Sequence, residues 1–158
     1  MSEVPRGSRD SLPEENGTGR SAAAGPDPAE VHAWYTTGMA LLGKSSPAAA
    51  AQVLQRAANA EPASRSVREA LARAQFNSGQ YQAAADNFRV IVEASPTDDY
   101  ACFGLGLSLA RAGDHGAAAE YLALAAAMRP DREPYTDALR QVRATLRFRK
   151  QAPGDPPQ

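Results

Sequence analysis

The sequence has one cysteine, few large apolar side chains and almost no excess of either charge, and each shortage excludes a class of protein. Cys102 alone cannot form an intramolecular disulfide or an all-cysteine metal site, so a reducing cytoplasm is the expected location. The 158 residues include 17 basic and 18 acidic side chains, so net charge indicates neither a nucleic-acid nor an anionic-membrane partner. No uninterrupted apolar run predicts a signal peptide or a membrane span.

Alanine dominates the apolar residues that are present. Hydrophobic residues make up 43% of the chain, and half of them are alanine. Alanine favours helix and lets helices approach closely, whereas a large β-rich core needs more branched and aromatic side chains. The composition therefore predicts an all-α protein of thin helix-on-helix layers, and its length predicts a single domain.

Both ends of the chain differ in composition from the middle. Residues 1–26 are rich in Gly, Pro, Ser and acids, which predicts a disordered leader. Order is expected to begin at 27–30, where Asp27 can cap a helix and Pro28 suits its first position. Residues 151–158 contain three prolines and are expected to form a short frayed tail, leaving 27–150 as the structured domain.

Between these ends the sequence repeats itself at a constant interval. Pro62, Pro96 and Pro130 mark a period of 34, and counting back from each proline aligns columns of small and of larger apolar residues. The aligned columns are Trp34/Arg68/Cys102, Gly38/Ala72/Gly106, Leu41/Gln75/Leu109, Ala50/Ala84/Ala118, Leu54/Phe88/Leu122 and Ala57/Ile91/Ala125. The second unit departs most, because Arg68 and Gln75 replace apolar residues there.

The pattern predicts two helices in each unit and one more after the last unit. The expected helices span 28–42, 47–60, 65–78, 81–94, 98–112, 115–128 and 132–149. Gly43, Gly79 and Gly113 are expected to end first helices in a left-handed conformation, while Ser46 with Pro47, and Asp114, cap the helices that follow. The last helix places Tyr135, Leu139, Val142 and Leu146 on one stripe, as a capping helix of a repeat stack would.

The repeat resembles the tetratricopeptide repeat family, whose unit reads W-x2-L-G-x2-Y, then A-x3-F, then P. The first unit has Trp34, Gly38 and Leu41, followed by Ala50-x3-Leu54. The third unit contains Leu105-Gly106-x2-Leu109 and Ala118-x3-Leu122. The resemblance implies a right-handed α-solenoid of three units, about 31–64, 65–98 and 99–132, plus a capping helix at about 132–149.

No residue pattern predicts catalysis, a cofactor or a metal site. His32 and His115 lie on different repeats, and Cys102 falls in a packing column, where a buried thiol is inert. Gly104 and Gly106 fall inside a helix, which excludes the strand–turn context of a dinucleotide-binding loop. The adjacent Asp98 and Asp99 are explained by helix capping. We therefore expect a protein without enzymatic activity.

The resemblance also implies a concave groove lined by the first helix of each unit. The residues that would face the groove share spacings of three, four and three, which put each set on one helical face. They are His32, Tyr35, Met39 and Leu42; Ser66, Glu69, Arg73 and Phe76; Tyr100, Phe103, Leu107 and Ala110. In the first and third units this face is apolar or aromatic, so it predicts either a bound partner or packing within the array.

We interpret the chain as a scaffold that binds a peptide or protein with apolar anchors through this groove. Some family members grip a C-terminal carboxylate with basic and amide side chains, but the matching positions here are Tyr35, Met39, Ala70, Tyr100 and Gly104, so a carboxylate-clamp ligand is not expected. A self-associating array, or a small secretion-type chaperone, remains the alternative.

The last predicted helix carries a basic flank. Helical spacing puts Arg140, Arg143, Arg147 and Lys150 together, and no acid lies between them in the sequence. Such a flank could contact acidic lipid, RNA or an acidic protein. A solvated face that complements the helix dipole explains it more simply, so we expect neither nucleic acid nor membrane as partner.

Overall fold

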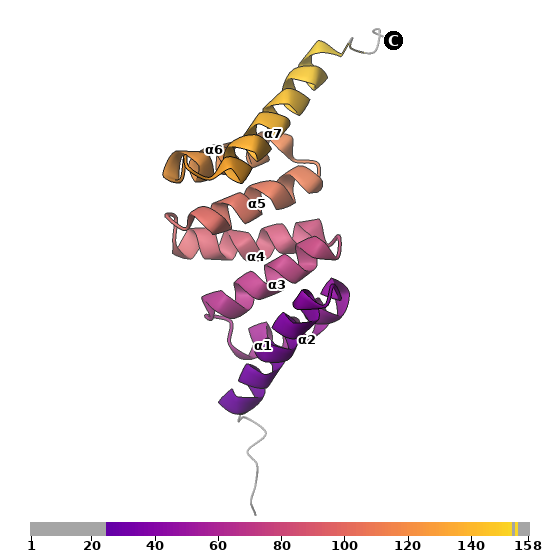
Figure 1. The fold of residues 1–158 in the computed structure, drawn as a ribbon, viewed down its shortest axis with the longest axis vertical. Helices are drawn as coiled ribbons and strands as arrows, with labels where there is room; N and C mark the ends of the chain where they lie inside the picture. The colour runs from indigo at the N-terminus through magenta and orange to yellow at the C-terminus, as the bar shows by residue number, and fades with distance from the viewer. Residues whose placement is uncertain (1–24, 153, 155–158) are drawn as a thin grey trace, which may run out of the picture.

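The computed structural model describes residues 25–152 and 154, and within that range the chain folds into seven α-helices. They are α1 (Pro28–Gly43), α2 (Pro47–Ala60), α3 (Arg65–Asn77), α4 (Tyr81–Ala94), α5 (Asp99–Arg111), α6 (His115–Met128) and α7 (Glu133–Gln151). Each helix packs against the next, and α1, α3, α5 and α7 also contact one another in sequence. The result is an all-α solenoid of helix–turn–helix units stacked in chain order (Figure 1).

The predicted helices agree closely with the observed ones. The first six differ from their expected bounds by at most one residue at either end. The last helix starts one residue later than expected and runs to Gln151, so the prediction that the tail begins at Gln151 is wrong. The predicted disordered leader, residues 1–26, lies outside the described residues except for Gly25 and Pro26.

Short polar side chains begin four of the helices. Asp27, Ser64, Asp98 and Asp114 each accept a hydrogen bond from a backbone N–H of the first turn. This satisfies one of the donors that a helix start leaves unpaired. Ser46 stands at the predicted cap position of α2, but its side chain makes no capping bond, so Pro47 alone marks that start.

A residue with a left-handed backbone conformation follows the first helix of each of the three units, but one of these residues is not at its predicted position. Gly79 and Gly113 have φ angles of 84° and 99°, as expected for glycine after a helix. The prediction for Gly43 is wrong, because Gly43 is the last residue of α1 and Ser45 adopts the positive φ of 58° instead. The first unit therefore turns two residues later than its glycine indicates.

The core is built from the aligned columns. The second-helix columns and Cys102 are buried, and the small residues of the first helices let large side chains approach their backbone. A Cβ atom on Gly38 would clash with Leu54 Cγ, and one on Gly106 would lie 2.6 Å from Leu122 Cγ. In the first and third units, therefore, a leucine side chain of the second helix packs directly against a glycine of the first helix.

The polar residues that replace apolar ones in the second unit take part in a chain of hydrogen bonds. Arg68 donates to Asn87 Oδ1 at 2.9 Å, and Asn87 donates to the buried Gln75 Oε1 at 2.7 Å. Arg68 also donates to the Pro62 carbonyl at 2.7 Å. Because each polar group has a partner, the unit tolerates two polar residues in apolar columns.

One face of the first helix of each unit differs in burial between α1 and the later units. The face formed by Val67, Ala70, Leu71 and Ala74 is buried in α3, and the positions one period later in α5 and two periods later in α7 are also buried. The corresponding positions of α1 are Ala33, Thr36, Thr37 and Ala40, and all four are exposed. Small and polar residues thus occupy this face of α1, the first of the described helices.

Tyr135 anchors α7 to the preceding unit. Its hydroxyl donates to Asp99 Oδ2 at 2.7 Å, and its ring lies 4.5 Å from the ring of Phe103 between centroids. Burial, together with the hydrogen bond to Asp99, raises the pKa of Tyr135 to about 12. The sequence indicated only a capping role for Asp99 and gave no sign of its bond to Tyr135.

Replacing Tyr135 with Phe is expected to lower the free energy of unfolding by about 1.5–3 kcal/mol at neutral pH, because a hydrogen bond to a carboxylate is lost. A raised tyrosine pKa stabilises the fold below the unfolded value of about 10, and this stabilisation disappears as the pH rises to about 12. The difference in stability between the two proteins should therefore shrink across that range. Urea unfolding at several pH values measures it, and a constant difference would contradict the assignment.

Candidate functional site

Eight residues of α3, α4 and α5 line an open pocket of about 290 Å³, which we call the central pocket. Its lining consists of Arg73, Phe76, Asn77, Phe88, Tyr100, Phe103, Gly104 and Leu107. Five of these eight are residues that sequence analysis assigned to the concave groove. The volume is at the small end of ligand sites and suits one or two side chains of a partner.

Gly104 explains why the pocket has an aromatic floor. A Cβ atom at this position would lie 2.5 Å from Phe88 Cζ, so only glycine lets the α4 ring reach between α3 and α5. Phe88 meets Tyr100 edge-to-face, with 6.3 Å between ring centroids. The sequence pattern placed Phe88 in a packing column and so did not indicate that it lines the pocket, whereas Gly104 was one of the positions that match a carboxylate clamp.

The pocket carries one positive charge. Arg73 is the only charged residue among the lining side chains. Burial raises the pKa of the Tyr100 hydroxyl, Arg73 opposes the rise and Glu69 adds to it. Tyr100 therefore remains a neutral hydrogen-bonding group at the rim, with 37% of the residue exposed.

Neighbouring side chains hold the pocket aromatics in place. Phe103 stacks on Tyr135 of α7, and Phe76 lies edge-on to Tyr81 with 5.3 Å between centroids. The Arg111 guanidinium stands 5.8 Å from the centre of the Phe76 ring. Each ring thus packs within the array on one side and lines the pocket on the other, which preorganises the walls.

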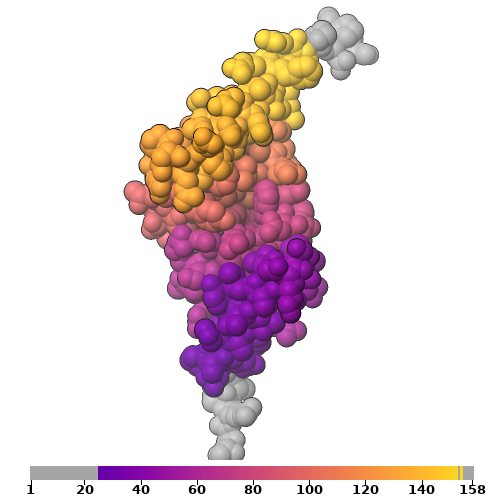
Figure 2. Space-filling view, in the orientation of Figure 1, coloured from indigo at the N-terminus to yellow at the C-terminus, as the bar shows by residue number. Residues whose placement is uncertain are grey.

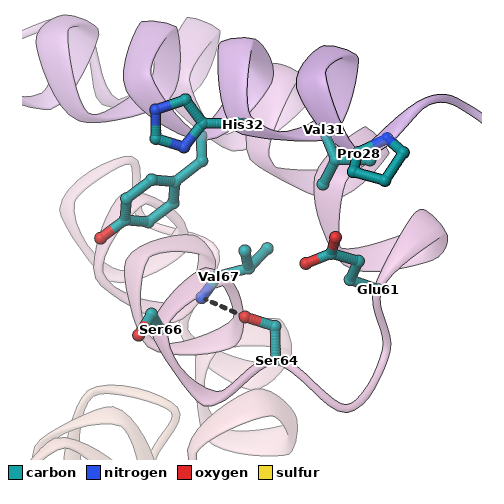
Figure 3. Close-up of a pocket in the computed structure, with 8 residues that line it drawn as sticks. Pro28, Val31, His32, Glu61, Ser64, Ser66 and Val67 are labelled. Atoms are coloured by element: carbon teal, nitrogen blue, oxygen red, sulfur yellow. Dashed lines mark hydrogen bonds between the residues drawn. The ribbon is translucent and has the colours of Figure 1, made fainter.

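A second pocket of about 220 Å³, the N-terminal pocket, lies between α1 and the start of α3 (Figure 3). Pro28, Val31 and His32 of α1 face Ser64, Ser66 and Val67, with Glu61 at the side. Tyr35 also lines it. Ser64 is engaged in capping α3, where its Oγ accepts from the Val67 amide at 3.4 Å.

The predicted groove face is therefore divided. His32, Tyr35 and Ser66 line the N-terminal pocket, whereas Met39 and Leu42 line neither pocket and pack against the core of the first unit. Ala110 packs against the core of the third unit. Glu69 lies between the two pockets along α3 and pairs with Arg65 at 2.8 Å.

The residues that sequence analysis weighed for catalysis stay apart. His32 lies on α1 and His115 on α6, and Cys102 is fully buried, with its thiol pKa raised first by burial and then by Asp98 and Asp99. Among residues 25–152 and 154, no cluster of three His, Cys, Asp or Glu side chains could hold a metal ion.

The repeat period and the stacked helix pairs agree with those of a known family. The tetratricopeptide repeat model matches the chain twice, over residues 35–99 and 69–133. The chain belongs to the tetratricopeptide repeat family. Tetratricopeptide repeats are protein-interaction scaffolds and are generally non-catalytic.

Solved structures of tetratricopeptide repeat proteins share the fold. The Sgt2 domain from Aspergillus fumigatus is 20% identical, with a TM-score of 0.70 over 85% of this chain and 89% of that domain. The first repeat domain of Spaghetti (RPAP3), bound to the HSP90 peptide SRMEEVD, is 15% identical, with a TM-score of 0.69 over 76% and 95%. YrrB, described as having an unusual peptide-binding site, is 24% identical, with a TM-score of 0.65 over 69% and 56%.

At these identities the similarity shows the fold alone. No curated protein sequence matches the chain. Within the part of the chain that the structure describes, no helix combines the length and the apolar character needed to cross a membrane.

Proposed function

We propose that this tetratricopeptide repeat domain binds a protein partner by taking an apolar side chain of that partner into the central pocket. The supporting observation is the pocket itself, which is open, has aromatic walls and floor, and stands on the first-helix face. Its walls belong to rigid helices, so binding requires little ordering of the domain. Apolar anchors in such pockets commonly supply most of the binding free energy.

The pocket chemistry defines the partner further. An aromatic or branched aliphatic anchor would contact Phe88 and Leu107, and a carboxylate next to that anchor would pair with Arg73. A terminal carboxylate alone is not an expected ligand. Of the five positions that correspond to a carboxylate clamp, Ala70 and Gly104 are buried, and none of the five carries a cation or an amide side chain.

Self-association by continued stacking is the less favoured alternative, and the two ends of the solenoid argue against it. The open end of α1 presents Ala33, Thr36, Thr37 and Ala40, which offer little apolar area to a second copy. The open side of α7 presents arginines. We therefore favour binding of a partner on the first-helix face over stacking of copies through α1 and α7.

Selection from a random peptide display library tests the proposed function without a known partner. Immobilised full-length protein should enrich peptides that share an aromatic or large aliphatic residue next to an acid. The same selection on a variant with Tyr100 and Leu107 replaced by Ala should not enrich them. Equal enrichment on both proteins, or enrichment of sequences without an apolar anchor, would contradict the proposal.

A further inference from the structure

We infer that the open side of α7 is a second binding site, which recognises an acidic helical segment of a protein partner. This basic face consists of Arg140, Arg143, Arg147 and Lys150. The inference is independent of the central pocket, because it rests on a different helix and on charge rather than on apolar area. Three observations carry it: the repeat register of α7, the shape of its surface and its unpaired charge.

The register shows what normally covers this side of a first helix. Counting one repeat period from Gly106 and from Leu109 leads to Arg140 and Arg143. In the preceding unit this side of the first helix faces the second helix of the same unit, as the contact of Gly106 with Leu122 shows. The face of α7 is therefore the surface on which a helix would lie, and α7 is the last helix among the described residues.

Arg140 stands in the column of small residues, and its size changes the kind of helix that can pack on α7. Gly38, Ala72 and Gly106 permit close contact between backbones, and Arg140 does not. A helix on α7 must stay further away and make contact through long side chains. Carboxylates on that helix could then reach the guanidinium groups in bidentate geometry.

The surface itself is open and hollowed. Thr136, Leu139, Arg140, Arg143 and Arg147 line a shallow depression of about 340 Å³. Leu139, which also lines the depression, is buried and belongs to the core that α7 shares with the preceding unit. The far end of α7 projects beyond the other described helices (Figure 2).

Most of the charge on this face is not neutralised within the domain. Arg140 pairs with Asp137 at 2.8 Å. Among the described residues, no ion pair joins Arg143, Arg147 or Lys150 to an acid. Three neighbouring cations that form no ion pair with another described residue repel one another, so an acidic ligand would relieve that repulsion as well as add contacts.

An acidic polypeptide fits this face better than a membrane does. A membrane-bound helix needs apolar side chains between its cations, so that both reach the same surface. Phe148 is the large apolar residue available, with 74% of its surface exposed, but it follows Arg147 and so points about 100° away from it around the helix. The basic residues span about 15 Å of one helix, which gives a nucleic acid few phosphate contacts.

The experiment uses full-length protein and a synthetic alanine-rich helical peptide with glutamates along one face. A peptide with glutamine at the same positions is the control ligand. Binding is measured by fluorescence anisotropy at low and at physiological salt. We expect the glutamate peptide to bind, the affinity to fall with salt, and the glutamine peptide to bind at least about tenfold more weakly.

Charge reversal localises the site. Arg143→Glu with Arg147→Glu should weaken binding of the glutamate peptide by at least about tenfold. The matched control, Arg56→Glu with Arg149→Glu, makes the same change in net charge on α2 and on another side of α7, and should change binding less than about twofold. All four side chains are exposed, so circular-dichroism melts of both variants should stay close to that of the unmodified protein.

Three results would overturn the inference. The first is equal binding of the glutamate and glutamine peptides, and the second is an equal loss in both charge-reversal variants. The third is tighter binding of anionic vesicles or RNA that depends on Arg143 and Arg147. Alanine at Tyr100 and Leu107 should leave binding of the glutamate peptide unchanged, so a failure of the central-pocket proposal and a failure here remain distinguishable.

Discussion

Valine in place of Gly106 is expected to lower the free energy of unfolding by about 3 kcal/mol, the upper end of the usual cost of overpacking. The added Cβ would lie 2.6 Å from Leu122 Cγ and 3.2 Å from the Ala118 carbonyl oxygen. Leu122 is fully buried and cannot swing away, and the carbonyl belongs to the α6 backbone. The two helices of the third unit must therefore separate, and urea unfolding measures the loss.

Gly116 provides a matched control, because it also lies in a helix but has open space around it. A Cβ there would meet only Asp114 Oδ1, at 3.9 Å. Gly116→Val should leave stability within about 0.5 kcal/mol of the unmodified protein. Equal effects of the two substitutions would mean that loss of glycine, and not the contact with Leu122, determines the result.

Replacing Tyr100 and Leu107 together with Ala is expected to weaken binding of a pocket ligand about a thousandfold. Interface anchors commonly contribute about 2 kcal/mol or more each, and both of these residues line the pocket. Tyr100 is exposed at the rim and Leu107 is half-buried, so the domain should remain folded. Affinity for a peptide selected on the unmodified protein gives the measurement.

These two residues test the pocket better than Phe103 does. Phe103 also stacks on Tyr135, so its truncation would loosen α7 and confuse folding with binding. Tyr121→Ala with Leu124→Ala is the matched control, since it removes the same side chains from α6, away from the pocket. If both double variants lose binding equally, general destabilisation and not the pocket explains the loss.

The repeat period explains why so much of the fold could be predicted. Leu54 recurs as Phe88 and Leu122 because the two helices of each unit pack in the same way. Each apolar residue alone would be weak evidence for a helix contact, but the three together at one spacing are strong evidence. Local departures were not predictable in the same way. Ser45 takes the left-handed position because the turn after α1 comes two residues later than Gly43 indicates, and the sequence does not show that.

The candidate site could be predicted only in part. Helical spacing placed Tyr100 and Leu107 on one face of α5. It gave no information on how side chains of α3, α4 and α5 combine to form the pocket. Phe88 lines the pocket because Gly104 leaves room for its ring, which is a contact between residues on different helices. Likewise, the bond between Tyr135 and Asp99 depends on how α7 docks, which spacing along one helix does not determine.

Mapping backbone amide shifts on binding tests the central-pocket proposal most directly. A peptide selected on the full-length protein is added to isotopically labelled protein, and the amide signals are followed by nuclear magnetic resonance. The proposal predicts that the largest changes fall on α3 and α5, around Asn77, Gly104 and Leu107. Changes concentrated on α2 and α6, with the signals of these three residues unmoved, would contradict it.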